Sequence, residues 1–219
     1  MIAAVVFDLD GVLVDSEQLW DRARRDLVHD RGGVWTPDAT RAMMGMSSPE
    51  WSRYMHDELR VDLAPEEIST AVVERLAALY EQRLPLLPGA VEAVAAAARR
   101  WRLGLASSSN REVIELVLDR ARLDEYFATA VSSEEVSRGK PAPDVYVETA
   151  RRLGVPAAEC AAVEDSTSGL RSAAAAGMAV VAFPNRAFPP AEEAVRLAAA
   201  VIGSLDELEA RLLALDSRA

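Results

Sequence analysis

An alternation of short apolar runs with longer amphipathic stretches fills the chain from about residue 102 onward and constrains the fold more than any other feature. The apolar runs predict strands over 102–107, 128–132, 160–164, 179–183 and 201–202. The stretches between and after them predict helices over 111–121, 144–153, 168–176, 191–199 and 205–215. Strands that alternate with helices in this way form a parallel sheet covered on both faces. With the buried run before Asp8 as a first strand, the pattern predicts an α/β fold with a doubly wound parallel sheet.

The segment from residue 16 to residue 84 breaks this alternation. It contains dense charges, helical periodicity and several Gly and Pro breaks, and no convincing strand. Pro85, Pro88 and Gly89 then mark a new start, which precedes an alanine-rich helix over 90–100. We therefore predict a core domain made of residues 1–15 and 85–219, with a small all-helical domain, residues 16–84, inserted after the first strand.

Composition excludes several classes of protein. The 219 residues suffice for one large domain or for a core with a smaller insert, and the formal net charge of −11 disfavours nucleic acid and anionic membranes as partners. One cysteine, Cys160, and two histidines exclude a disulfide and a zinc cluster of Cys or several His. No apolar run approaches the roughly 20 residues of a membrane helix, and Met1 leads directly into the first strand. We expect a cytoplasmic protein that binds neither nucleic acid nor membrane, as a monomer or weak homodimer.

Polar residues follow the predicted strands where ligands bind in an open parallel sheet, at the carboxyl ends of the strands. Asp8 and Asp10 follow the first strand, residues 107–110 end the second strand and follow it, and Glu164 and Asp165 end and follow the strand over 160–164. Lys140, the only lysine among 24 Lys and Arg residues, lies in the loop after the strand near residue 130. We expect these residues to converge on one pocket.

The chemistry of these residues favours phosphoryl transfer. Carboxylates that meet in one pocket repel one another unless a cation lies among them, and an all-oxygen ligand set favours Mg²⁺ over zinc. A lone lysine and several hydroxyls can bind a phosphoryl group. Of two carboxylates spaced as Asp8 and Asp10, one can attack phosphorus while the other carries a proton for the leaving oxygen.

Four segments carry a resemblance to a known family. They are DLDGVLVDSE at 8–17, ASSSN at 106–110, GKPAPDVY at 139–146 and VEDSTSG at 163–169. Their order and spacing, over nearly the whole chain, resemble the four motifs of the haloacid dehalogenase-like (HAD) superfamily. Within it, the chain is similar to the phosphatase and β-phosphoglucomutase-like group, which has a Rossmann-like core and a helical cap after the first motif.

The resemblance implies roles for the catalytic and phosphate-binding residues. Asp8 resembles the nucleophile, and Asp10 resembles the general acid and base. Ser107 resembles the hydroxyl that binds the phosphoryl group, with help from the backbone amide of Ser108 or Leu9. Lys140 resembles the cation that stabilises the nucleophile and the transferred group.

The resemblance also implies a Mg²⁺ site. Asp8 and Asp165 would bind the ion through their side chains and Asp10 through its backbone carbonyl, and Glu164 would bind it directly or through water. Candidate substrate contacts are fewer and lie mostly in the helical segment: Trp20, Gly45, Met46, Ser47 and Asn110.

The same resemblance leaves more than one activity open. In β-phosphoglucomutases a His stands where this chain has Trp20, and an Arg that holds a second phosphate stands where this chain has Ser48. Both departures favour a Mg²⁺-dependent phosphatase that hydrolyses a small phosphomonoester, a sugar or polyol phosphate, through an aspartyl-phosphate intermediate. A phosphosugar mutase is the alternative. A 2-haloacid dehalogenase would have no use for Asp10 or Mg²⁺, and a phospho-acceptor signalling module would carry its acceptor after a middle strand.

Overall fold

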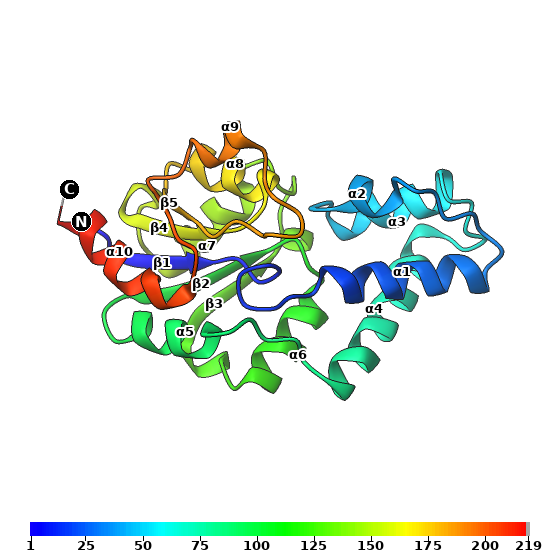
Figure 1. Cartoon of the computed structure of the whole chain (residues 1–219), viewed down its shortest axis with the longest axis horizontal. Helices are drawn as coiled ribbons and strands as arrows, with labels where there is room; N and C mark the ends of the chain where they lie inside the picture. Colours follow the sequence, from blue (N-terminus) through cyan, green and yellow to red (C-terminus); the bar gives the residue numbers. More distant parts are fainter. Residues whose placement is uncertain (218–219) are drawn as a thin grey trace.

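Six parallel strands form one sheet, which lies between helices in the part of the molecule that holds both chain ends (Figure 1). A computed structural model describes residues 1–217. The strand order is β3-β2-β1-β4-β5-β6. The strands are β1 (Ala4–Phe7), β2 (Arg102–Ser107), β3 (Phe127–Ser132), β4 (Cys160–Glu164), β5 (Ala179–Ala182) and β6 (Ala200–Val201). The chain winds outward from β1 to β3 on one side and then from β4 to β6 on the other. The switch in direction therefore falls between β1 and β4, where a ligand site is expected.

Helices cover both faces of the sheet, as the alternating sequence pattern predicts. Val5 and Phe7 of β1 point into one hydrophobic core, and Ala4 and Val6 point into the other. The first core includes side chains from α5 (Ala90–Ala98), α6 (Arg111–Ala121) and α10 (Leu208–Asp216). The second includes side chains from α7 (Asp144–Leu153), α8 (Thr167–Ala175) and α9 (Glu192–Val195). A strand buried on both faces reads as a continuous apolar run, and this explains the sequence of β1.

Four helices lie between β1 and α5, beyond the carboxyl ends of the strands (Figure 1). They are α1 (Glu17–Asp30), α2 (Ala39–Met43), α3 (Ser48–Asp57) and α4 (Pro65–Gln82). The longest of them, α4, packs against both α1 and α3. Trp51, Leu76 and Tyr80 are among the fully buried side chains of this helical insertion. The sequence-based prediction of an α/β core with an all-helical insertion after the first strand is confirmed.

Several elements are shorter than the sequence predicts. The helix expected over 191–199 is the single turn α9, because the Ala199 amide donates to the Val180 carbonyl at 2.8 Å and the chain already joins the sheet there.

Short 3-10 turns over Asp124–Tyr126, Ser133–Glu135 and Ala157–Glu159 precede or follow strands and were not predicted. Among the helices of residues 1–217, none is both long enough and apolar enough to cross a membrane.

Candidate active site

A cavity of about 620 Å³ lies between the carboxyl ends of the strands and the helical insertion. Its walls from the sheet side include Asp8, Asp10, Ser108, Lys140 and Asp165. The strand-end loops meet at this cavity because parallel strands end at the same edge of the sheet. Of the residues expected there, Ser107, Asn110 and Glu164 do not line it.

Lys140 lies between two carboxylates at the base of this cavity. Its Nζ is 2.8 Å from Oδ1 of Asp8 and 2.6 Å from Oε1 of Glu164, and its side chain is only 3% exposed. Burial raises the pKa of Asp8 to about 8 against the opposing effect of Lys140, and Glu164 and Asp10 raise it further. Burial alone would lower the pKa of Lys140, but Asp8 and Glu164 outweigh burial and hold that pKa above its ordinary value. Lys140 is therefore charged and supports the ionised form of Asp8.

Three buried acids at the same place fit a divalent cation. Carboxylate oxygens of Asp8, Glu164 and Asp165 lie within 4.8 Å of one another. Glu164 is satisfied by Lys140, by the Tyr146 hydroxyl at 2.9 Å and by backbone amides. By contrast, no side chain or amide of residues 1–217 donates to the Asp165 carboxylate. Burial, Glu164 and Asp8 raise the pKa of Asp165 well above its ordinary value. The single positive charge of Lys140 does not balance three carboxylates. Their oxygen atoms therefore suit a hard divalent cation as an additional partner.

Asp10 stands apart from the three acids and accepts hydrogen bonds from hydroxyl groups and from an indole. Ser109 Oγ donates to its Oδ2 at 2.6 Å, and Trp20 Nε1 donates to its Oδ1 at 3.1 Å. Ser16 also donates to Oδ1, and the Ser107 hydroxyl lies 3.5 Å from Oδ2. The Asp10 carboxylate thus lies in the cavity and is oriented by partners other than Asp8.

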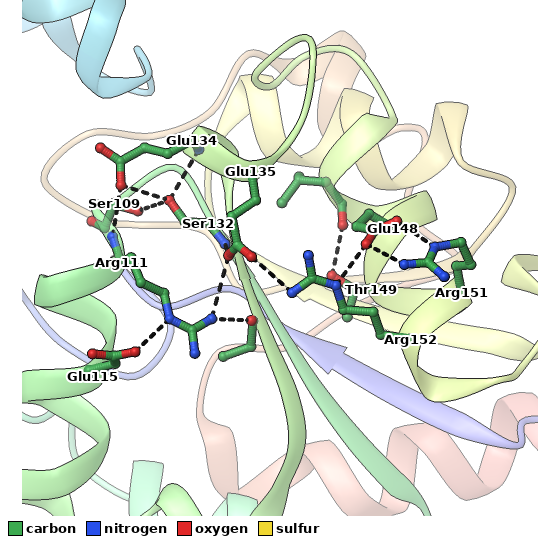
Figure 2. Close-up of polar contacts among 12 residues, drawn as sticks. Ser109, Arg111, Glu115, Ser132, Glu134, Glu135, Glu148, Thr149, Arg151 and Arg152 are labelled. Atoms are coloured by element: carbon green, nitrogen blue, oxygen red, sulfur yellow. Dashed lines mark hydrogen bonds and ion pairs between the residues drawn. The ribbon is translucent and has the colours of Figure 1, made fainter.

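The serine loop, residues 107–110 at the end of β2, is held by the last residue of β3 and by the turn that follows it. The Ser132 hydroxyl donates to the Ser109 carbonyl at 2.7 Å (Figure 2). The Ser133 hydroxyl donates to the Ser108 carbonyl at 3.1 Å. Ser107 is fully buried, and its hydroxyl accepts from the Ser109 amide at 3.0 Å. The Ser108 hydroxyl is buried and has no hydrogen-bond partner among the described residues. Ser108 and Ser109, rather than Ser107, line the cavity and offer it polar groups.

The structure brings only some of the predicted substrate contacts to the cavity. Trp20, Gly45 and Met46 line it. Ser47 instead precedes α3 as its N-cap residue, where its hydroxyl and amide both donate to Glu50 Oε2. Asn110 lines a separate cleft, where its amide donates to Glu134 at 2.8 Å and its carbonyl oxygen accepts from the Ser48 hydroxyl at 2.7 Å.

Glu17 and Arg24 are among the cavity residues that were not predicted. Both come from α1, and Arg24 lies one helical turn after Trp20. The spacing Ser16–Trp20–Arg24 places these residues on one helix face, and that was the available signal. Burial raises the pKa of Glu17 to about 7, although Arg24 lowers it.

Fold and site together define a class of protein: a doubly wound α/β enzyme whose strand-end carboxylates, lysine and serines suit phosphoryl transfer. Residues 2–177 match the family of haloacid dehalogenase-like hydrolases. The chain belongs to this family.

Named relatives agree with this assignment. Hexitol phosphatase B of Escherichia coli is 36% identical over 218 residues, which are 96% of each chain. A phosphorylated carbohydrates phosphatase of Thermotoga maritima is 34% identical over 80% of this chain and 82% of that protein. The crystal structure of CbbY from Rhodobacter sphaeroides in complex with phosphate superposes with a TM-score of 0.83 at 29% identity, over 95% of this chain and 96% of that one. The protein is a phosphoric monoester hydrolase that acts on small phosphates.

Proposed function

We propose that the protein is a Mg²⁺-dependent phosphatase that hydrolyses a small sugar or polyol phosphate through an aspartyl phosphate on Asp8. The observation that carries this proposal is the arrangement of Asp8 against Lys140, at 2.8 Å, in a cavity that also holds Asp10. The relatives named above are phosphatases of phosphorylated hexitols and carbohydrates, which supports the substrate class.

In the first step Asp8 forms a bond to phosphorus through a carboxylate oxygen, and the bond from phosphorus to the ester oxygen breaks. Asp10 donates a proton to the leaving oxygen, so that an alcohol departs. In the second step water attacks phosphorus, the bond from phosphorus to Asp8 breaks, and Asp10 takes the proton of that water. Lys140 favours the ionised form of Asp8 against the opposing effect of burial, and it offsets charge on the transferred group.

Three carboxylates and the serine loop complete this site. Asp8, Asp165 and Glu164 would hold the Mg²⁺, with Asp10 contributing its backbone carbonyl. When bound, the ion supplies Lewis-acid stabilisation of the negative charge on the phosphoryl oxygens. The Ser108 hydroxyl, which has no partner among the described residues, would donate to a phosphoryl oxygen, with Ser107 holding the loop. The helical insertion, residues 16–84, would act as a cap domain on the core of residues 1–15 and 85–219. This cap would exclude water from the site and select the leaving group.

Two residues of the helical insertion, Trp20 and Ser48, favour hydrolysis over mutase activity. Trp20 donates to Asp10, and Ser48 donates to Asn110 outside the cavity, so neither position supplies a cation for a second phosphate.

Steady-state kinetics with a panel of sugar and polyol phosphates, in Mg²⁺ and after EDTA treatment, test the proposal. We expect phosphate release that EDTA abolishes and Mg²⁺ restores, with higher kcat/KM for polyol or sugar phosphates than for p-nitrophenyl phosphate. Turnover that EDTA leaves unchanged would contradict the metal requirement. Efficient conversion of β-glucose 1-phosphate in the presence of glucose 1,6-bisphosphate would contradict hydrolysis as the main activity.

A further inference from the structure

The cavity wall that faces Asp8 from the helical insertion contains two polar groups without partners. Arg24 is 6% exposed, and no hydrogen bond or ion pair within residues 1–217 involves its side chain. Its buried Nε lacks a partner, and so does the buried Oε1 of Glu17. Both residues line the same cavity as Asp8, Asp10 and Lys140. A buried donor or acceptor without a partner costs free energy, and a ligand that supplies the partner removes that cost.

The guanidinium of Arg24 is held in place by aromatic rings. Its Cζ lies 4.8 Å from the centre of the Trp20 ring and 5.1 Å from that of the Trp51 ring. The two rings are themselves 6.0 Å apart and tilted by 60°. Aromatic rings contact the faces of a guanidinium and leave its N–H edge available. A planar group fixed in this way loses little side-chain freedom when it binds a ligand.

The charges around Arg24 favour a neutral acceptor over a second anionic group. Burial disfavours the charge of Arg24, and the carboxylates of Glu17, Asp10 and Asp21 act in the opposite direction and favour it. A second phosphate beside Arg24 would also lie near Glu17 and Asp10, which would repel it. A hydroxyl-bearing fragment instead has oxygens that accept from Arg24 and O–H groups that donate to Glu17.

We propose that Arg24 and Glu17 form a hydroxyl-binding subsite for the leaving group, with Arg24 as the residue that determines specificity for a polyhydroxylated substrate. This inference rests on the proposed phosphatase function and adds the side chains that select its substrate. Arg24 donates to ligand hydroxyls while the two tryptophans fix its plane. Glu17 accepts from the same or a neighbouring hydroxyl.

The test compares kcat/KM for sorbitol 6-phosphate, which has hydroxyls, with kcat/KM for p-nitrophenyl phosphate, which has none. Arg24→Met keeps the length of the side chain and removes its donors. We expect the ratio of the two kcat/KM values to fall roughly 10- to 100-fold in this variant, as for loss of a hydrogen bond from a charged donor. Arg24→Lys should lower the ratio too, because an ammonium cannot stack as a planar fork. Arg22→Met is the matched control, since Arg22 lies on the exposed side of α1 in an ion pair with Asp26, and its ratio should equal that of the wild type.

A ratio between two substrates does not depend on the fraction of folded enzyme, which separates specificity from damage to the fold. Glu17→Gln provides a second measurement if Arg24→Met does not fold, and it should lower the same ratio. Equal losses on both substrates in the Arg24 and Glu17 variants would overturn the subsite, and so would a wild type that prefers fructose 1,6-bisphosphate to sorbitol 6-phosphate. A wild type that hydrolyses none of these esters with Mg²⁺ would instead overturn the proposed function itself.

Discussion

Lys140 shows at the scale of one residue why an ammonium and a guanidinium are not interchangeable. Every other basic residue among the 24 is Arg, yet this position holds Lys. Its Nζ lies within 2.8 Å of one carboxylate and 2.6 Å of another in a site with almost no exposed surface. A compact point charge fits between two carboxylates where a planar fork of five donors does not. The Lys140 ammonium therefore contacts both carboxylates at once and favours the ionised form of Asp8 against the effect of burial.

Lys140→Arg should abolish most phosphatase activity and leave the fold intact. We expect kcat/KM to fall by at least about 100-fold, because the larger group displaces Asp8 or Glu164. Phosphate release and circular dichroism are the measurements. Arg138→Lys, the reverse exchange at an exposed position of the same loop, is the control and should change little. Near-normal turnover in Lys140→Arg would show that the ammonium is not needed.

Asp10→Asn should affect substrates according to their leaving groups. An alkyl phosphate needs a proton on its leaving oxygen, and p-nitrophenyl phosphate does not. We expect kcat/KM for the alkyl ester to fall on the order of 10²- to 10⁴-fold and that for p-nitrophenyl phosphate to fall much less. The exposed carboxylate of Asp15, changed to Asn, is the control. Equal losses on both esters would argue against Asp10 as the acid.

Glu17→Gln should change how stability depends on pH. The carboxyl has an ordinary pKa of 4.5 and a folded-state pKa of about 7, so the unfolded chain releases this proton first as pH rises. The protonated Glu17 carboxyl therefore contributes its full share to the free energy of unfolding below pH 4.5. That contribution, measured against Glu17→Gln, is lost as the pH rises to about 7. The loss has an upper bound on the order of 3 kcal/mol, which urea unfolding at about pH 5 and about pH 8 measures. A difference between the two proteins that stays constant over this range would contradict the raised pKa.

Sequence alone predicted which core-motif residues lie at the cavity better than it predicted those of the helical insertion. Asp8, Lys140 and Asp165 follow strands, and the direction of a parallel sheet fixes the edge at which they meet. Ser47 and Asn110 were expected at the cavity but lie outside it, because a loop can turn its polar side chains either way. Arg24 lies in a helix with many charged residues, so the sequence does not distinguish it from the exposed ones. Only the packing of α1 shows that its side chain is buried.

At the scale of elements, the junction between β4 and α8 determines where the acids lie. Glu164 ends β4, and Ser166 begins α8 by accepting from the Gly169 amide at 3.1 Å. Gly169 lies so close to Glu164 that a Cβ there would overlap the carboxylate. The sequence predicts both elements, but it does not predict this close approach, nor the 3-10 turns that adjust the strand ends.

Gly169→Ala should destabilise the protein, although Ala normally stabilises a helix relative to Gly by about 1 kcal/mol. The added methyl displaces Glu164 and with it Lys140, at a cost of roughly 1–3 kcal/mol. Thermal unfolding and phosphate release measure the two consequences, a lower Tm and a lower kcat/KM. An unchanged or higher Tm together with wild-type activity would mean that the junction has room for the methyl.

At the scale of the whole molecule, the helical insertion lies beyond the carboxyl ends of the core strands (Figure 1), and both parts contribute residues to the cavity. The sequence predicted this division because strand and helix periodicities change at residues 16 and 85. It did not reveal which side chains of the insertion face the core, since that depends on packing between segments far apart in the chain. The expected cytoplasmic location and the monomer or weak homodimer stay predictions.

The central claim is that Asp8 is the nucleophile, and the turnover of Asp8→Asn tests it most directly. An amide of the same shape keeps the packing at the end of β1 but cannot form the aspartyl phosphate. With Mg²⁺ and a sugar or polyol phosphate, we predict that kcat falls by more than about 10³-fold in a protein that unfolds as cooperatively as the wild type. Phosphate release within about tenfold of the wild-type rate would contradict covalent catalysis by Asp8.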